Sequence, residues 1–438
     1  MRLWPLSNNA RSKQFLPLLP DGKGGSESMV QRVVRQIRQT GLARNVTIAT
    51  NSSQRDILIN QLGEGIDIVI EPERRDTFPA IALASAYLKY ELGVSDDEVV
   101  VVMPCDPFTE AGYFSAICRM AGAVAADVAE LVLMGIKPTY PSSIFGYIVP
   151  GSVPDGTGPV AVERFTEKPD RATAEELLDR GAMWNGGVFA FRLGYVTGKL
   201  RAYVDTDEFA QVVSRYGELP KISFDYEVVE KAASVAMVPY DGQWKDLGTW
   251  NAFTAEMAFD VRGNAKLGPE TSGVQVVNEL GVPIFVDGID NAVVAASPDG
   301  ILVCGKPQSE NIKKYVADLV DRPMFEERRW GTYRVLDIKS YDDGFKSLTR
   351  KVYLKAGKFI SYQMHFRRDE AWTFVDGEGA VCVEGKVRKV GRGDVILIKN
   401  GTRHSVKALT DLTFIEVQSG DLVSEDDVQR FDFQWQEL

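Results

Sequence analysis

Cysteine and histidine are both scarce in this chain. Among 438 residues there are four cysteines, none in a CxxC spacing, and two histidines. Cysteines so few and so scattered cannot form the disulfide framework of a small secreted protein. Their scarcity is typical of chains that fold in a reducing compartment, so we expect a cytoplasmic protein.

Long apolar runs and an excess of basic charge are missing as well. No run reaches the length of about 18 apolar residues that a transmembrane helix needs, and the N-terminal segment lacks the apolar core of a signal peptide. Lysine and arginine number 50 against 61 aspartates and glutamates, which gives a net charge of −11. Nucleic-acid binding requires a basic surface, although a few local cations can still bind a nucleotide. We therefore expect no nucleic acid and no membrane among the partners.

The composition that is present is that of a globular protein, with 45% hydrophobic and 25% charged residues. Such a balance excludes a disordered or fibrous chain. At ~100–200 residues per domain, the length predicts two to four domains, each large enough for its own core.

The first part of the chain has the pattern of an α/β domain. Short runs of β-branched and aliphatic residues predict strands buried on both faces, and the helical patterns near them end at Gly41 and Gly93. This alternation predicts a parallel sheet. The predicted strands cover 46–50, 66–70, 99–103 and 131–136, and the predicted helices cover 29–37 and 78–92.

After about residue 260 the pattern becomes β-rich. Many short apolar runs, separated by turn residues, predict a sandwich or small barrel. A connecting helix is expected at 313–319. The predicted strands cover 274–277, 284–286, 301–304, 350–354, 371–375, 380–383, 395–398 and 412–417.

Seven clusters of unusual residues lie along the α/β region, at positions where strands should end. Ligands of such sheets bind outside the carboxyl ends of the strands. The clusters are Arg2-Leu-Trp-Pro-Leu with Lys13-Gln-Phe-Leu, Glu71 to Ile81, Val102 to Asp106, Phe145 to Ile148, Phe165 to Pro169, Trp184 to Gly187, and Trp244 to Trp250.

Together and in this order, the clusters resemble the sugar-1-phosphate nucleotidyltransferases. The mannose-1-phosphate guanylyltransferase branch is the nearest in pattern, and its longer members carry a C-terminal mannose-6-phosphate isomerase cupin. The resemblance covers essentially the whole chain. It implies a doubly wound, Rossmann-like α/β nucleotidyltransferase domain over 1–260, a β-rich connector over 261–325 that is a short left-handed β-helix in the resembled proteins, and a cupin β-barrel over 326–438.

The resemblance also implies a reaction, in which GTP and mannose 1-phosphate give GDP-mannose and diphosphate. A sugar-phosphate oxygen attacks the α-phosphorus, so the protein must align two polyanions and neutralise their charge. A Mg²⁺ ion, or Mn²⁺, held by carboxylates suits this task. GTP and mannose 1-phosphate are then the expected partners.

Individual residues match the motifs of that family. Asp106 and Asp246 match its metal-binding carboxylates. The other matches are Arg2 and Lys13 at the triphosphate, Glu71, Arg75, Asp76 and Pro79 with Asp106 at the nucleotide, Lys168 at the sugar phosphate, and Gly146, Glu167, Asn185 and Gly186 at the sugar hydroxyls. Arg2, Lys13 and Lys168 are the expected catalytic contacts.

Each match also has a structural interpretation. An aspartate after a strand, such as Asp106, is commonly a cap or turn residue. Lys168 could be a solvated loop lysine, and Asn185-Gly-Gly could be a hairpin turn. The joint occurrence of the motifs favours the functional interpretation over these.

Two departures from the family pattern concern the nucleotide. Family members have a strand and a Gly-rich, triphosphate-binding turn just before the Arg-Leu-x-Pro segment, whereas the printed sequence begins at Met1-Arg2. We expect either a start assigned too late or a truncated protein. Asp76 stands where the guanylyltransferases usually have Asn, and Pro107 replaces a common His, which could alter the nucleotide preference.

The C-terminal motifs resemble the two cupin motifs, with a damaged metal signature. Gln363, His365, Glu370 and His404 could hold a metal such as Zn²⁺. Arg367 stands where a second His should be, and we expect its charge beside the site to oppose metal binding. Ala371 replaces the His that follows the Glu, whereas Arg368 and Trp372 are retained. A structural cupin without isomerase activity is therefore expected.

Two other functions stay open at this point. One is the same chemistry on a different sugar phosphate or nucleotide. The other is an inactive sugar-nucleotide-binding protein. Strand edges in the β-rich region could also pair copies of the chain into a homo-oligomer.

Overall fold

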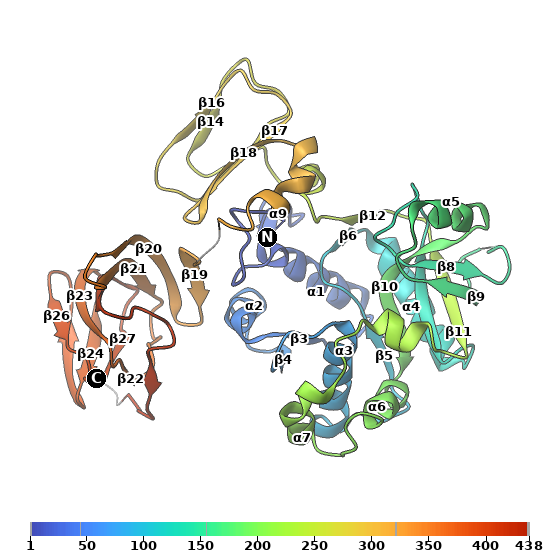
Figure 1. Ribbon diagram of the computed structural model, residues 1–438, viewed down its shortest axis with the longest axis horizontal. Helices are drawn as coiled ribbons and strands as arrows, with labels where there is room; N and C mark the ends of the chain where they lie inside the picture. The colour runs from blue at the N-terminus through green and yellow to red at the C-terminus, as the bar shows by residue number, and fades with distance from the viewer. Residues whose placement is uncertain (1, 44, 155, 320–321, 436–438) are drawn as a thin grey trace. The chain divides into compact units, whose positions relative to one another are not determined.

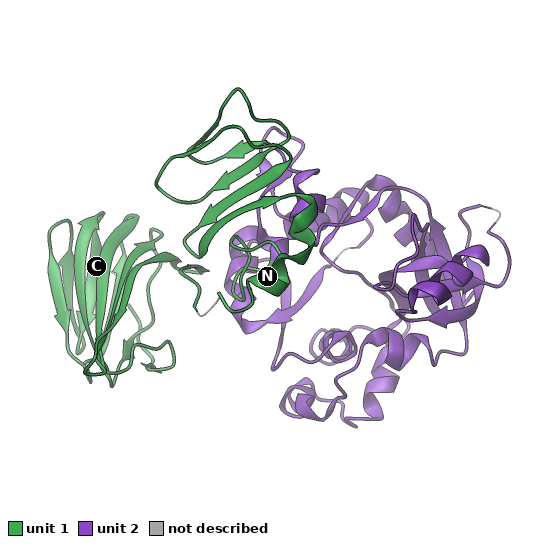
Figure 2. Cartoon of the chain, turned by 45° about the horizontal axis from the view of Figure 1, so that its top comes forward, with its two compact units in different colours: residues 1–12, 259–438 green, residues 13–258 purple. Residues whose placement is uncertain are grey.

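The computed structural model describes residues 2–43, 45–154, 156–319 and 322–435. The chain divides into two compact units (Figure 2). Residues 13–258 form the first, which we call the α/β unit, and residues 1–12 with 259–438 form the second, the β unit. Within the described residues, every helix is too short or too polar to span a bilayer.

A six-stranded sheet forms the centre of the α/β unit (Figure 1). β11 runs parallel to β7, but β10 lies antiparallel between β5 and β7. The prediction of a parallel sheet is therefore wrong, because a continuous apolar run indicates burial on both faces and says nothing of direction. In spatial order the strands are β5 (Val99–Val102), β10 (Met183–Arg192), β7 (Leu131–Ile136), β11 (Val235–Tyr240), β9 (Val160–Thr166) and β8 (Tyr147–Pro150).

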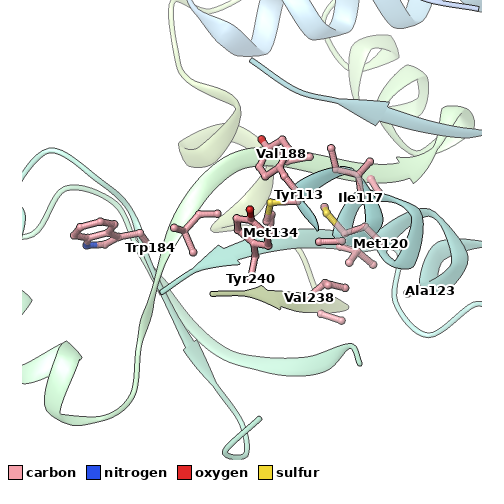
Figure 3. Close-up of a cluster of buried hydrophobic side chains, with 14 of the residues drawn as sticks. Tyr113, Ile117, Met120, Ala123, Met134, Trp184, Val188, Val238 and Tyr240 are labelled. Carbon is pink, nitrogen blue, oxygen red and sulfur yellow. The ribbon is translucent and has the colours of Figure 1, made fainter. Parts of the chain in front are cut away.

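Helices cover both faces of this sheet. Successive side chains of β7 point to opposite faces, and all six are buried. Met134 packs with Ile117 and Met120 of α4 on one face (Figure 3), whereas Leu131 and Leu133 belong to the core on the opposite face, which contains α3 and α6. The unit is thus a doubly wound α/β domain, as the sequence predicted. Its helices are α1 (Met29–Thr40), α2 (Arg55–Leu62), α3 (Thr77–Ala86), α4 (Ala111–Ala125), α5 (Arg171–Asp179), α6 (Leu193–Arg201), α7 (Phe209–Ser214) and α8 (Trp250–Thr254).

The predicted ends of two helices are confirmed. Ser28 begins α1 with a capping box, in which Ser28 Oγ accepts from the Gln31 N–H and the Gln31 side chain accepts from the Ser28 N–H. Gly41 ends α1 with φ +64°, a conformation that favours glycine. α3 continues as the π-helical turn η3 (Tyr87–Glu91), and Gly93 follows with φ +67°.

Small two-stranded sheets bring distant segments of the α/β unit together. β3 (Thr47–Asn51) and β4 (Asp67–Glu71) pair in parallel. β6 (Pro107–Thr109) pairs antiparallel with β12 (Trp244–Asp246), with Pro107 opposite Asp246. This second pairing sets the position of the candidate site. The remaining pair is β1 (Leu19–Pro20) with β2 (Ser26–Glu27).

The β unit begins with parallel strands, in which β13, β15 and β17 pair in turn and β14 pairs with β16. The sequence placed residues 1–12 in the α/β domain, but in the structure they belong to the β unit. Arg11, for example, makes two hydrogen bonds to Glu279, at 2.9 and 3.0 Å. The expected helix at 313–319 is the shorter α9 (Ile312–Tyr315). The strands are β13 (Val261–Arg262), β14 (Ala265–Leu267), β15 (Gln275–Asn278), β16 (Ile284–Val286), β17 (Ala292–Ser297) and β18 (Gly300–Gly305).

Two antiparallel sheets of six and five strands form the C-terminal barrel. Trp372, Phe374 and Phe414 lie in its core. All five strands that the sequence predicted here are present. In spatial order the sheets are β19 (Phe325–Arg328), β20 (Gly331–Ser340), β21 (Lys346–Leu354), β28 (Leu412–Gly420), β23 (Arg368–Asp376) and β26 (Val395–Ile398), and β25 (Lys386–Val390), β24 (Gly379–Val383), β27 (His404–Ala408), β22 (Gln363–Met364) and β29 (Gln429–Arg430).

Candidate functional site

Two carboxylates from distant segments meet on one lysine. Asp106 lies between β5 and β6, and Asp246 ends β12, so the pairing of β6 with β12 brings the two together. Lys13 Nζ lies 3.0 Å from Asp106 Oδ2 and 3.0 Å from Asp246 Oδ1. Both carboxylates are partly exposed. The two carboxylates that the sequence predicted as a metal-binding pair therefore lie close together.

The partners of Lys13 keep its ammonium protonated. Burial lowers the pKa of the ammonium, but the negative charges of Asp106 and Asp246 outweigh that effect and leave the pKa above its ordinary value. The donor chemistry fits a divalent cation, because two carboxylates already converge on one cationic atom and Mg²⁺ is bound in proteins through one or two carboxylates plus phosphate oxygens. A metal ion held by Asp106 and Asp246 would free Lys13 for a phosphate.

The predicted sugar-phosphate lysine lies in an unusual backbone conformation. Lys168 has φ +45°, in the left-handed region that residues other than glycine rarely adopt. Its Nζ lies 2.6 Å from Glu167 Oε1; the lysine side chain is 52% exposed and that of Glu167 only 6%. Residues in strained backbone conformations cluster at binding sites, so this conformation favours a binding role for Lys168.

The predicted sugar-hydroxyl residues lie together around Glu167. A Cβ at Gly146 would overlap the Glu167 carboxylate, so only glycine leaves room for it. Asn185 lies at a β-bulge of β10, where its backbone N–H donates to Gly146 O at 2.8 Å. Bulges re-aim side chains near sites. Asn185 is therefore not in a simple hairpin turn, and it lies in one cluster with Gly146 and Glu167.

The predicted nucleotide residues surround the start of α3, where most of them also have structural partners. Asp76 caps the helix by accepting from the Thr77 N–H at 2.7 Å. Arg75 donates to the Leu219 carbonyl and pairs with Glu73. Glu71 ends β4 and accepts from the Tyr216 hydroxyl at 3.1 Å. Their nucleotide contacts remain predictions, as does that of the exposed Arg2, which falls in the other unit.

One acidic residue that sequence reasoning missed joins this cluster. Asp225 opens the π-helical turn η5 (Asp225–Val229), and its Oδ1 accepts from Asn185 Nδ2 at 2.6 Å. Burial, and then the neighbouring charge of Glu167, raise its pKa to about 6. The sequence carried no signal for this role, because Asp225 meets Asn185 and Glu167 only through contacts between segments that are far apart in the chain.

The interior of the barrel holds a buried polar cluster. One ligand atom from each of His365, Glu370 and His404 lies within 4.8 Å of the others. Glu370 accepts from Arg368 at 3.1 Å and from Trp372 at 3.2 Å. The Arg368 guanidinium also lies 3.2 Å from His365 Nε2. Burial, then the Arg368 charge, lower the pKa of His365 to about 4.

The predicted effects of Arg367 and Ala371 on this cluster are wrong. Residues 365–367 lie between β22 and β23, so the two-residue alternation breaks there and Arg368 points inward instead. Arg367 is 54% exposed and pairs with Asp421 at 2.6 Å. Ala371 alternates with the buried Glu370 and Trp372, so it lies on the outer face of β23. Arg368, not Arg367, is the cation beside the candidate ligands.

The cluster does not fit a resident metal as it stands. Two imidazoles and a carboxylate are suitable Zn²⁺ donors, and buried His404 Nε2 has no hydrogen-bond partner in the described part of the barrel. However, the Arg368 charge already neutralises Glu370, and Gln363 Nε2 lies 3.3 Å from His365 Nε2. A cation bound by these ligands would therefore lie beside a buried guanidinium, whose charge opposes its binding.

Comparisons with known proteins identify the family of the chain. The family model Nucleotidyl transferase matches residues 1–263, and the model Mannose-6-phosphate isomerase C-terminal matches residues 320–433. Xanthan biosynthesis protein XanB of Xanthomonas campestris pv. campestris (strain B100) is 32% identical, over 98% of this chain and 96% of its own length. Mannose-1-phosphate guanylyltransferase of Escherichia coli (strain K12) is 31% identical, over 98% of this chain and 95% of its own.

A solved structure is also similar. It is described as mannose-1-phosphate geranyltransferase from Thermus thermophilus, and it matches 73% of this chain and 95% of its own with a TM-score of 0.57 and 28% identity. Nucleotidyl transferases act with a divalent metal ion on a nucleoside triphosphate and a sugar phosphate. The chain belongs to the nucleotidyl transferase family, in the form that carries a mannose-6-phosphate isomerase C-terminal domain after the transferase domain.

Proposed function

We propose that this protein is a mannose-1-phosphate guanylyltransferase, which converts GTP and mannose 1-phosphate into GDP-mannose and diphosphate for polysaccharide synthesis. The observation that carries the proposal is the convergence of Asp106, Asp246 and Lys13, in the same unit as the Glu167–Lys168 pair. The relative named mannose-1-phosphate guanylyltransferase supports the choice of sugar and base, and the xanthan biosynthesis protein supports a role in polysaccharide synthesis. The scarcity of cysteine supports a cytoplasmic site of action.

The residues of the α/β unit can align two polyanions. Asp106 and Asp246 would hold Mg²⁺, which neutralises charge at the α-phosphate. Lys13 keeps its proton, since its pKa is raised, and can donate to a triphosphate oxygen. The exposed ammonium of Lys168 can donate to the sugar phosphate, while Glu167 and Asn185 offer an acceptor and a donor to sugar hydroxyls.

The reaction needs no protein base. A phosphate monoester has its second pKa near 6, so the attacking oxygen is already largely ionised near neutral pH. The sequence agrees, since both histidines, His365 and His404, lie in the barrel and none lies in the α/β unit. Alignment and electrostatic stabilisation, rather than proton transfer, then account for catalysis.

The proposed pair of substrates can be tested by diphosphate release. The full chain with Mg²⁺ would be assayed against four nucleoside triphosphates crossed with several sugar 1-phosphates. The pair of GTP and mannose 1-phosphate should give the highest kcat/KM. A different best pair would replace the substrate assignment, and release with no pair would favour an inactive binding protein.

Replacement of a proposed metal carboxylate should cost turnover and not folding. In Asp246→Asn, Lys13 still pairs with Asp106, so we expect the melting temperature to change little. Turnover should fall roughly 10²–10⁴-fold, because stabilisation of transition-state charge is lost. Steady-state kinetics and a thermal melt measure the two effects.

Glu256→Gln is the matched control, because it removes a carboxylate that pairs with Lys245, the neighbour of Asp246. It should leave turnover almost unchanged. Near-normal turnover in Asp246→Asn, with an unchanged melting temperature, would remove Asp246 from the proposed metal site.

We propose further that the barrel holds no resident metal and does not interconvert mannose 6-phosphate and fructose 6-phosphate. Isomerisation requires a group that polarises the sugar carbonyl and a base that moves the proton. Here Glu370 is neutralised by Arg368, and the lowered pKa of His365 makes that imidazole a weak base. Elemental analysis of the purified chain and a coupled assay for fructose 6-phosphate test both statements.

Two adjacent arginines offer a test of what opposes metal binding. Arg368→Met removes the buried cation beside Glu370, so Zn²⁺ should bind more tightly and raise the melting temperature of this variant. Arg367→Met removes only the exposed partner of Asp421 and should behave like the unchanged chain. Calorimetric titration with Zn²⁺ measures the affinities. Equal Zn²⁺ affinity in both variants would show that Arg368 does not oppose the metal.

A further inference from the structure

Asp225 is a carboxylate that the proposed mechanism does not use. It is half-buried at the start of the π-helical turn η5, and its Oδ1 accepts from Asn185 Nδ2 at 2.6 Å. π-helical turns are rare in proteins, and those that occur are often found at functional sites. The short distance indicates a charge-assisted hydrogen bond.

This bond completes the orientation of the Asn185 amide. Asn185 Oδ1 accepts from the Gly187 N–H at 3.1 Å, while Nδ2 donates to Asp225. With both ends engaged, the amide plane cannot rotate. An amide nitrogen carries two hydrogens, and the second has no acceptor among the described residues. It is the hydrogen that Asn185 can offer to a sugar hydroxyl.

The backbone holds Asp225 in place. The Phe224 N–H donates to Thr77 Oγ1 at 2.8 Å, and the Phe78 N–H donates to Ile222 O at 3.3 Å. The segment before η5 is thus fixed to the first turn of α3. Asp225 therefore presents its carboxylate from a supported position rather than from a free loop.

The surroundings of Asp225 raise the free energy of its ionised form. Glu167 and Lys168 lie close enough for their charges to act on Asp225, the first unfavourably and the second favourably, and burial opposes ionisation. Asparagine in its place could accept the same hydrogen bond without that cost. A residue kept at such a cost beside a binding pocket is a candidate for a functional role.

We propose that Asp225 is a positioning residue for the sugar phosphate, which acts by fixing the Asn185 amide toward the sugar. The inference rests on the proposed function and deepens it, because it assigns the sugar contact to an oriented amide. A purely structural Asp225 would affect folding, or both substrates alike. A positioning residue affects the sugar phosphate selectively.

The experiment compares variants of the full chain with Mg²⁺. Asp225→Ala removes the acceptor, so the KM for mannose 1-phosphate should rise roughly 10-fold, since orienting a buried polar donor contributes about that factor. The KM for GTP should stay within about 2-fold. Asp225→Asn keeps an acceptor oxygen and should recover most of the loss. Asp225→Leu, of similar volume, replaces the alanine variant if that folds poorly.

Two further variants separate positioning from general disturbance. Glu227→Ala is the matched control, because Glu227 lies in the same turn and bonds to Tyr203 and Lys231 instead of the pocket. It should leave both KM values unchanged. If Asp225 acts through Asn185, Asp225→Ala should add little to the loss that Asn185→Ala causes alone.

An unchanged KM for mannose 1-phosphate in Asp225→Ala, equal rises for both substrates, or additive effects with Asn185→Ala would each overturn the inference. Such outcomes leave the proposed function intact as long as the unchanged chain turns over. If the unchanged chain shows no turnover, the proposed function fails. In that case the inference is tested by the calorimetric Kd for mannose 1-phosphate, compared among the same Asp225, Asn185 and Glu227 variants.

Discussion

The ion triad of Lys13, Asp106 and Asp246 is the interaction on which the transfer site depends. Two like charges brought together in a partly buried place repel, and a cation between them removes that cost. The pairing of β6 with β12 fixes the two carboxylates, and Lys13 brings the start of the α/β unit to them. A bound metal ion could take over the same neutralising role, so the site keeps its geometry while its lysine is released to a phosphate.

The barrel also holds neighbouring carboxylates that need cationic partners, but there both partners are buried. Glu370 and Glu416 are buried with Arg368 and Arg350 as their partners, and these four side chains are nearly inaccessible. Buried pairs of this kind repay their desolvation only through good geometry and further hydrogen bonds, which Trp372 supplies to both carboxylates. The difference between the two places is access. In the transfer site the carboxylates are partly exposed and can exchange their partner for a ligand, whereas the barrel leaves its charges no such exchange.

Much of the fold could be predicted from the sequence, because burial on both faces and helix caps are local signals. The strand at 131–136 and the helix end at Gly41 were predicted correctly. The direction of β10 could not be predicted, because direction is decided by the whole sheet. The inward turn of Arg368 was missed for a related reason: three residues outside any strand interrupt the alternation, and only the folded barrel shows where it resumes. Family motifs named the carboxylates Asp106 and Asp246 and the lysine Lys13 that the structure brings together, yet they left out Asp225.

Asp225 accounts for the orientation of the Asn185 amide in the proposed sugar site. Gly146 leaves room for Glu167, and Asn185 lies at the bulge of β10, where its amide bonds to Asp225. An amide can rotate by half a turn at little cost unless both ends are bound, and a rotated amide would offer its oxygen where its nitrogen is needed. Specific recognition of a hydroxyl pattern requires that donors and acceptors do not exchange places. The bonds from Gly187 and to Asp225 meet that requirement. If Asn185 binds the sugar as proposed, the selectivity of the site would depend on a residue that acts on the sugar only through its neighbour.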